Sequence, residues 1–259
     1  MISGISRNGK SITPLERLLT YLYHIGCNVG YYHAGTNHGL SRGAVCESIK
    51  FVNDAIFDKV VPLYIKYPDE DMAREEARLF SEISKGFPPV IWSALDGTHC
   101  EVRAPVNEDD TETFRNRHHY LSLNVMVVVG ASGRFYYIHS STPGSQHDSR
   151  IAEESKLFQK LREGGYKPFI DANGDIAIII ADSAYKSDND WMAVPFTIAE
   201  TLSNELKHRF NVKFKRARNC VERFIGVVKA RFPILDGCIK YVDFEDAGRF
   251  MSVVLLVFR

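Results

Sequence analysis

Three carboxylate residues stand where their side chains could act together in one reaction. Asp96 follows the apolar segment 90–95, and Asp182 follows the apolar segment 176–181, each of which is typical of a buried strand. In an α/β sheet, polar residues just beyond the carboxyl ends of the strands line the functional crevice. Glu222 lies forty positions after Asp182, in a predicted helix over 216–231. We therefore expect the three side chains to share one site.

The chemistry that such a site favours is metal-assisted phosphoryl transfer. Three converging carboxylates repel one another unless a cation lies between them, and hard oxygen ligands suit Mg²⁺ or Mn²⁺. Two such ions, about 3.5–4 Å apart, can activate a water or a 3′-hydroxyl and stabilise the leaving oxygen of a phosphodiester. A single Asp at a strand end is more often a cap or a turn residue, which is the alternative for each aspartate taken alone.

Positive charge is concentrated around the third carboxylate. Lys+Arg and Asp+Glu number 32 each, so the formal net charge is zero, yet residues 207–231 hold nine Lys or Arg and only one acid, Glu222. Such a strip can be a nuclear localisation signal, a solvated helix face or a phosphate-contacting surface, and we favour the last. The candidate DNA-binding residues in it are Lys215, Arg216, Arg218, Arg223 and Lys229.

The first third of the chain predicts helices. Pro14 after Thr13 starts a helix over 14–29, and Ser41 is a good N-cap for a second one that extends to about residue 61. This unit resembles a helix-turn-helix DNA-binding domain, but a small helical packing domain explains it equally well. A charged helix over 69–85, between prolines, completes a connector.

The rest of the chain predicts a mixed α/β domain. Four further segments have strand character, 90–95, 99–104, 121–129 and 135–140, followed by a helix over 148–163, the strand 176–181 and helices over 200–210, 216–231 and 244–258. We therefore predict a small all-α domain over 1–88 and a three-layer α/β catalytic domain over 89–259.

Five sequence blocks together resemble the PIF/Harbinger transposase superfamily. They occur in the family's order, over roughly residues 90–250, and are 94–99 (ALDGTH), 114–125 (FRNRHHYLSLNV), 143–149 (PGSQHDS), 180–185 (IADSAY) and 218–232 (RNCVERFIGVVKARF). The resemblance implies an RNase H-like fold, with a mixed five-stranded sheet between helices, and a DDE triad. That triad falls on Asp96, Asp182 and Glu222, the residues selected above by their positions.

The same resemblance implies a function. A DDE endonuclease or transposase hydrolyses DNA phosphodiesters with two divalent metal ions, Mg²⁺ or Mn²⁺, and in active transposases the freed 3′ end is joined to target DNA. It further implies a nuclear protein, present also in the cytoplasm, that acts on DNA as a homo-oligomer and uses a Myb/SANT-like partner. The rival hypothesis is a domesticated, catalytically silent module that binds DNA or protein.

Several residues of these blocks have two interpretations. His99 and His147 are candidate site-lining groups, because a histidine beside a carboxylate can act as a general acid or position a phosphate. Asp148 could line the site as well, but we interpret it as the N-cap of the following helix. Arg115 and Arg117 are candidate DNA contacts, or else belong to a solvated loop with His118 and His119.

Other protein classes find less support. The longest apolar runs are far shorter than a membrane span, so we expect a soluble intracellular protein with no membrane contact. Five cysteines without a Cys-x-x-Cys pair suggest neither a zinc site nor a disulfide framework. The pair His147-Asp148 occurs in HD-type phosphohydrolases, but that fold is all-helical. No Gly-x-Ser-x-Gly elbow or phosphate-binding loop is present.

Overall fold

A mixed five-stranded sheet forms the centre of the protein. The computed structural model describes residues 11–103, 108–185, 189–239 and 244–258, so the expectations for residues 1–10 lie outside the described part. The strand order is β3-β2-β1-β4-β5, with antiparallel pairing among β1, β2 and β3 and parallel pairing among β1, β4 and β5. The strands are β1 (Ile91–Glu101), β2 (Ser122–Val129), β3 (Phe135–Pro143), β4 (Ile178–Ile180) and β5 (Met192–Ala193).

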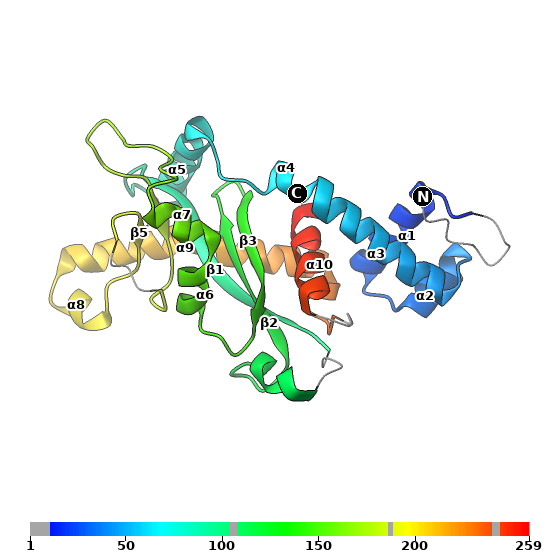
Figure 1. Ribbon diagram of the computed structural model, residues 1–259. Helices are drawn as coiled ribbons and strands as arrows, with labels where there is room; N and C mark the ends of the chain where they lie inside the picture. Colours follow the sequence, from blue (N-terminus) through cyan, green and yellow to red (C-terminus); the bar gives the residue numbers. More distant parts are fainter. Residues whose placement is uncertain (1–10, 104–107, 186–188, 240–243, 259) are drawn as a thin grey trace.

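Helices cover both faces of this sheet and extend beyond one edge (Figure 1). They are α1 (Pro14–Cys27), α2 (Tyr31–His38), α3 (Arg42–Lys59), α4 (Val61–Tyr64), α5 (Glu70–Ser84), α6 (Asp148–Glu154), α7 (Lys156–Arg162), α8 (Ile198–Leu202), α9 (Glu205–Arg231) and α10 (Phe244–Val257). Buried side chains of α9 and α10 pack on one face of the sheet, and those of α6 and α7 pack on the other. The predicted three-layer α/β architecture is confirmed, and it is consistent with an RNase H-like fold.

Strand β1 is longer than the sequence pattern indicated. The expected strands 90–95 and 99–104 are one element, because the ladder to β2 continues without a break from Ala94 to Glu101. Asp96 therefore lies inside a strand and not after it. Only the first part of β1 also pairs with β4, so β1 is flanked on both sides up to Ala94 and on one side beyond it. The edge beside Asp96 is where the ladder to β4 ends.

Helix starts were predicted better than helix lengths. Helix α1 starts at Pro14 as expected, with a capping box of Thr13 and Glu16 that was not predicted. The Ser41 side chain accepts a hydrogen bond from the Ala44 N–H at the start of α3, which confirms the predicted cap. The expected helix 148–163 is two helices, because Ser155 is extended and caps α7. The expected helices 200–210 and 216–231 are instead the short α8 and one continuous α9, since no Gly or Pro interrupts 205–225.

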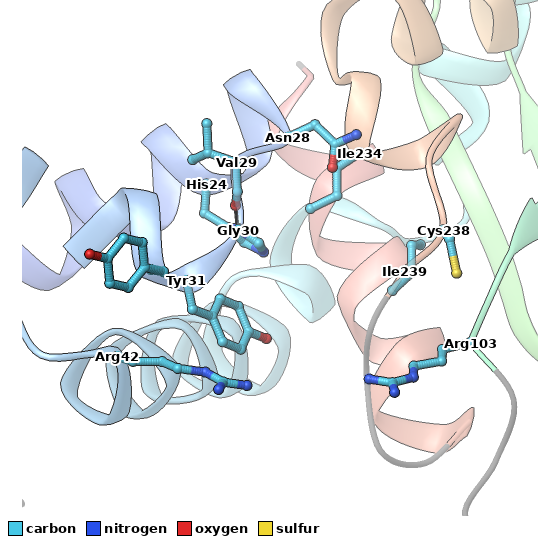
Figure 2. Close-up of a pocket in the computed structure, with 11 residues that line it drawn as sticks. His24, Asn28, Val29, Gly30, Tyr31, Arg42, Arg103, Ile234, Cys238 and Ile239 are labelled. Carbon is cyan, nitrogen blue, oxygen red and sulfur yellow. Dashed lines mark hydrogen bonds between the residues drawn. The ribbon is translucent and has the colours of Figure 1, made fainter. Parts of the chain in front are cut away.

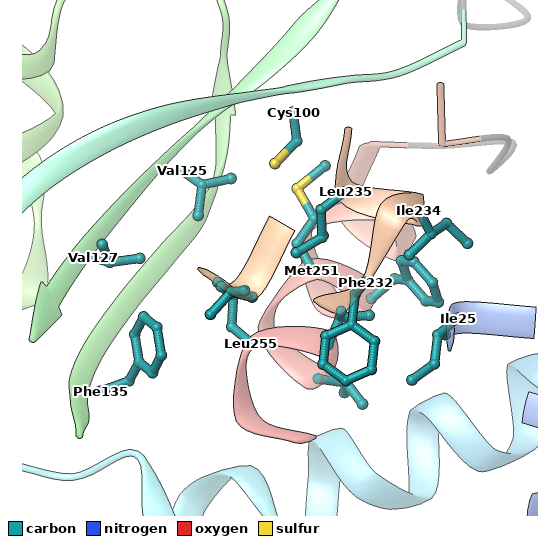
Figure 3. Close-up of a cluster of buried hydrophobic side chains, with 14 of the residues drawn as sticks. Ile25, Cys100, Val125, Val127, Phe135, Phe232, Ile234, Leu235, Met251 and Leu255 are labelled. Carbon is teal, nitrogen blue, oxygen red and sulfur yellow. The ribbon is translucent and has the colours of Figure 1, made fainter. Parts of the chain in front are cut away.

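The N-terminal helices share an apolar core with the sheet. Figure 1 shows α10 between the sheet and α1–α3, and α10 contacts both β3 and α3. In Figure 3, Met251 and Leu255 of α10 lie between Val125 of β2 and Ile25 of α1, all within one buried cluster. The boundary at residue 88 stays a prediction, but the apolar core is continuous across it.

Two simple absences hold for the described part of the chain. None of its helices combines the length and the hydropathy that crossing a membrane requires. All five cysteines are free thiols.

A buried carboxylate links α5 to the turn between β2 and β3. Glu76 is 3% exposed, and its side chain accepts hydrogen bonds from the Ser132 N–H (2.9 Å), the Ser132 hydroxyl and the Tyr136 hydroxyl (2.7 Å). The backbone at Gly130 comes so close to this carboxylate that a Cβ there would lie 2.4 Å from Glu76 Cδ. A glycine is therefore required at that position.

We expect Glu76→Ala to lower the free energy of unfolding by about 3 kcal/mol, because the variant leaves three buried donors without their acceptor. Tyr136→Phe, which removes one hydroxyl from the network, should cost about 1 kcal/mol. Urea denaturation followed by circular dichroism measures both. Glu75→Ala is the matched control on the exposed face of the same helix, and a Glu76 variant as stable as this control would contradict the assignment.

Candidate active site

The register between two parallel strands places Asp96 and Asp182 side by side. Ala94 of β1 pairs with Ile180 of β4, and each aspartate lies two residues further along its strand direction. Because side chains alternate along a strand, Asp96 projects to the same face as Ala94. Asp182, the first residue beyond the sheet, lies close enough for its charge to act on Asp96. The face of Ala94 is covered by α9, since Ala94 and Ile180 belong to the cluster that contains its buried side chains. The two carboxylates therefore approach α9 together.

The turn after β4 holds Asp182 in place. The Ala181 N–H still pairs with the Ala193 carbonyl (3.0 Å), and the next residue leaves the sheet. Asp182 Oδ1 accepts a hydrogen bond from the Ala184 N–H (2.7 Å), and its carbonyl accepts one from the Tyr185 N–H (3.3 Å). The aspartate thus closes a tight turn with one carboxylate oxygen. Its position after a strand is as predicted.

Glu222 is brought to the aspartates by α9 and linked to them through Arg218. Phe214, Ala217 and Val221 bury one side of the helix against the sheet. One turn separates Arg218 from Glu222, and its Nη2 donates a hydrogen bond to Glu222 Oε1. Its Nη1 lies 3.6 Å from Asp96 Oδ2. The guanidinium therefore bridges two of the predicted triad carboxylates.

The pKa of Asp96 is raised mainly by burial and further by nearby negative charge. Burial raises the pKa of Asp96 to about 6; the Arg218 guanidinium and the Gly97 N–H lower it, and the charges of Asp182 and Glu222 raise it further. The two other carboxylates thus act directly on Asp96. A cation added beside Asp96 would favour its ionised form.

The donor set suits a hard cation, although Arg218 supplies the positive charge in this arrangement. Asp96, Asp182 and Glu222 offer only carboxylate oxygens, which match Mg²⁺ or Mn²⁺ and not a soft metal. Within the described ranges, no three His, Cys, Asp or Glu side chains already form a metal-ligating group. The Arg218 guanidinium occupies the position of a counter-ion between Asp96 and Glu222. The residues present fit a divalent ion in chemical type.

Asp148 does not have the role we assigned to it. His147 is the N-cap of α6, without a side-chain capping bond, and Asp148 is the first residue of the helix. Its Oδ1 instead accepts a hydrogen bond from Asn124 Nδ2 (2.6 Å) across the sheet. A Cβ at Gly97 would lie 3.0 Å from the same oxygen, so the glycine permits this approach. The N-cap interpretation was wrong because sequence spacing does not reveal a partner on another strand.

Tyr185 is a residue whose role the sequence did not indicate. It is 2% exposed, and its buried phenol oxygen has no hydrogen-bond partner among the described residues. Burial raises its pKa, and the charges of Asp148, Asp96 and Asp182 raise it further. A buried, unpaired hydroxyl next to these carboxylates is a candidate contact for a substrate or a water. The block 180–185 contained it, but nothing in that block distinguished it from a core tyrosine.

The candidate histidines lie away from the three carboxylates. His99 is three residues after Asp96, an odd spacing that turns its side chain to the opposite face of β1. Its Nδ1 lies 3.0 Å from Ser122 Oγ, and burial lowers its pKa while the charge of Asp148 raises it. His147 is exposed at the start of α6. If they line the site, His99 and His147 would act from the face of β1 on which Asp148 lies.

The candidate DNA-binding residues divide into exposed and internally paired groups. Lys215, Arg216 and Arg223 are exposed on α9, and Arg117 is exposed in its loop. Arg115 is exposed too, but it pairs with Glu112 (2.9 Å). Lys229 Nζ donates to the His99 carbonyl (3.1 Å) and lies 3.5 Å from Asp236. Lys229 and Arg218 are thus already engaged inside the protein.

Comparison with known proteins extends these observations. The family described as DDE superfamily endonuclease matches residues 95–258. The proteins named "Putative nuclease HARBI1" of rat and human are 24% and 22% identical over 243 residues, 91% of this chain and 63% of theirs. "Protein ALP1-like" of Arabidopsis thaliana is 20% identical over 255 residues, 96% of this chain and 61% of its own. The chain thus spans less than two thirds of these relatives. No solved structure matches it.

We expect Asp96→Asn to stabilise the metal-free protein at pH 7.5 by about 2 kcal/mol. The pKa of Asp96 is raised to about 6 from an ordinary 3.8. The protonated form of Asp96 therefore makes its full contribution to stability below pH 3.8, and this contribution is lost as the pH rises through 6. Asn carries no such charge, so the gain should vanish near pH 4. Urea unfolding in EDTA at both pH values measures it.

The control for this prediction is Asp236→Asn, which neutralises a carboxylate that is 61% exposed. That variant should be no more stable than wild type at either pH. An unchanged free energy of unfolding for Asp96→Asn at pH 7.5 would contradict the prediction. It would mean that Arg218 and the Gly97 N–H fully offset the cost of burying the ionised carboxylate.

Proposed function

The chain belongs to the DDE superfamily endonuclease family, and on this premise we propose that it is a metal-dependent DNA endonuclease that hydrolyses phosphodiester bonds. The predicted kinship with Harbinger transposase-derived nucleases is confirmed by the family and by its relatives. The observation that carries the proposal is the register of β1 and β4, which sets Asp96 beside Asp182 facing the helix of Glu222.

In this proposal each residue has a distinct task. Asp96, Asp182 and Glu222 hold the divalent ions, Mg²⁺ or Mn²⁺, which when bound activate the attacking oxygen and stabilise the leaving one. The exposed Lys215, Arg216 and Arg223 of α9 hold the DNA backbone beside them. The Tyr185 hydroxyl, buried and unpaired among the described residues, positions an oxygen on the Asp148 side of β1.

Arg218 can bind either the site carboxylates or a phosphate. Its guanidinium binds Asp96 and Glu222 in the free protein, and the same planar group binds a phosphate in a bidentate manner. Divalent ions held by these carboxylates would compensate their charge, and the Arg218 guanidinium would then be available for a DNA phosphate. This exchange keeps the buried negative charge compensated in both states.

A second candidate function is a silent module that binds DNA without cutting it. The observation that favours it is the same Arg218 bridge, which compensates Asp96 and Glu222 without a metal. In that case the exposed cations of α9 would still bind the DNA backbone. The two hypotheses differ in whether divalent ions displace Arg218.

The wider activity of the protein is also part of the proposal. By its family resemblance, we propose that it works in the nucleus, acts on DNA as a homo-oligomer, and is assisted by a Myb/SANT-like partner. Joining of the freed 3′ end to target DNA would follow from the same site.

We expect Asp96→Asn, Asp182→Asn and Glu222→Gln each to abolish the nicking of supercoiled DNA in Mn²⁺ or Mg²⁺. Each variant removes one charge from the metal-holding set, and loss of such a ligand typically costs several kcal/mol of transition-state stabilisation. Calorimetric titration of Mn²⁺ into wild type and Asp182→Asn should show binding and nicking lost together.

The matched control is Glu205→Gln. Glu205 pairs with Arg209 on the same helix and at the same spacing that joins Glu222 to Arg218, but it lies at the start of α9, seventeen residues before Glu222. This variant should nick like wild type. Nicking by any triad variant at the wild-type rate would refute the enzyme hypothesis, and absence of Mn²⁺ binding by the wild type would favour the silent module.

We expect the triple variant Lys215→Ala, Arg216→Ala, Arg223→Ala to bind DNA of every sequence more weakly, since phosphate contacts carry no sequence information. The slope of log K against log salt for duplex DNA should fall by about 0.9 for each lost contact. Fluorescence anisotropy over a salt series measures both. An unchanged slope would place the DNA on another surface.

A further inference from the structure

A cavity of about 380 Å³ lies between the N-terminal helices and the catalytic domain, apart from the carboxylates described above. Figure 2 shows its two walls: His24, Val29, Gly30, Tyr31 and Arg42 on one side, and Arg103, Ile234, Cys238 and Ile239 on the other. Its size falls in the range of small-molecule sites. No part of the proposed cleavage chemistry uses it.

Two arginines project into this cavity from opposite walls. In Figure 2 the guanidinium groups of Arg42 and Arg103 point toward one another across the opening. Neither one forms an ion pair with a described residue, and the described residues that line the cavity include no Asp or Glu. Two uncompensated guanidinium groups facing one space form a site for an anion, and their planar shape suits a phosphate.

Both arginines stand on well-defined backbone segments, and their side chains are exposed. Arg103 follows β1, and its N–H donates to the Ile239 carbonyl (3.0 Å), so the segment after the 3₁₀ turn at 233–235 is tied to the strand. Arg42 is the first residue of α3, after the Ser41 cap. A cation at that position is unfavourable for the helix dipole, and the first turn of α3 contains no acid. A residue placed against local preference is expected at a functional site.

The remaining lining adds aromatic surface and a further source of positive potential. Tyr31 is half-buried beside Arg42, and its ring lies 5.2 Å from the ring of His24. Gly30, the N-cap of α2, also lines the cavity and has no side chain that could cap the first N–H groups of this helix. An arginine pair next to an aromatic ring is the combination that binds unpaired nucleotides.

We propose that this cavity binds one unpaired nucleotide, with its phosphate between Arg42 and Arg103 and its base against Tyr31. The identification of the nucleotide as part of a DNA strand rests on the proposed function; a free nucleotide offers the same chemistry. A strand held here is fixed to the N-terminal helices and to the end of β1 at the same time. The cavity thereby sets the position of DNA relative to the cleavage site.

The test is binding of a short fluorescein-labelled single-stranded oligothymidylate, followed by anisotropy in EDTA, where no cleavage occurs. Arg42→Ala and Arg103→Ala should each weaken binding about tenfold, the effect of one charged hydrogen-bonding partner. Each should also lower the salt slope by about 0.7. Arg78→Ala, on the exposed face of α5, is the control and should bind like wild type. Melting temperatures establish that all variants are folded.

Competition identifies the source of the nucleotide. Displacement of the oligomer by thymidine 5′-monophosphate, but not by thymidine, supports the proposal. Binding of the monophosphate alone, without the oligomer, assigns the cavity to free nucleotides and overturns the DNA part. Equal displacement by inorganic phosphate overturns the role of the base, and wild-type binding by both arginine variants overturns the whole proposal.

The same variants separate this inference from the proposed function. Asp182→Asn should bind the oligomer like wild type while failing to nick DNA, which supports both. If wild type does not nick DNA but binding still depends on Arg42 and Arg103, the cavity stands and the nuclease function fails. If wild type nicks DNA but both arginine variants bind the oligomer normally, the nuclease function stands and the cavity proposal fails.

Discussion

The burial of a carboxylate, Asp96, beside two further carboxylates is the constraint that shapes the rest of the site. Asp96 is largely buried and carries a raised pKa, and two further carboxylates raise it more. Such a group persists only if positive charge is available nearby, since uncompensated buried charge is costly. Arg218 provides that charge in the free protein, and its position on α9 links the helix to β1. The proposed metal ions would replace this compensation with a stronger one.

Strands β1 and β4 and helix α9 fix the positions of these carboxylates relative to one another. Strand β1 pairs with β2 along most of its length and with β4 only at its beginning, so Asp96 lies beside the point where β4 ends and Asp182 begins its turn. The long α9 crosses the same face and adds Arg218 and Glu222 from one turn. On the opposite face Gly97 lets Asp148 approach the strand, and Tyr185 lies near both sides. Strand β1 thus has a polar cluster on each of its two faces.

Positive charge is distributed over two separate regions despite a net charge of zero. One is the exposed side of α9, next to the carboxylates, and the other is the cavity between Arg42 and Arg103. The continuous apolar core around α10 packs the N-terminal helices against the central sheet, so both regions belong to parts of the protein that share one core. A substrate that spans both would be held in a fixed orientation. This is the arrangement that a nucleic acid, with charge repeated along its backbone, could use.

Features that depend on local pattern could be predicted from the amino-acid sequence. The fold class, most strands, the helix start at Pro14 and the cap at Ser41 followed from such patterns, and so did the positions of Asp182 after a strand and Glu222 on a helix, whereas Asp96 lies inside β1. The contacts between residues distant in the sequence could not be predicted and came from the folded structure. It moved Asp148 from a cap to a contact with Asn124, turned His99 to the other face, and engaged Arg218 and Lys229 inside the protein. It also formed the cavity from residues far apart in the chain. The physical reason is that caps and periodicity are set by neighbours in sequence, whereas strand register and helix packing bring together side chains that no local pattern connects.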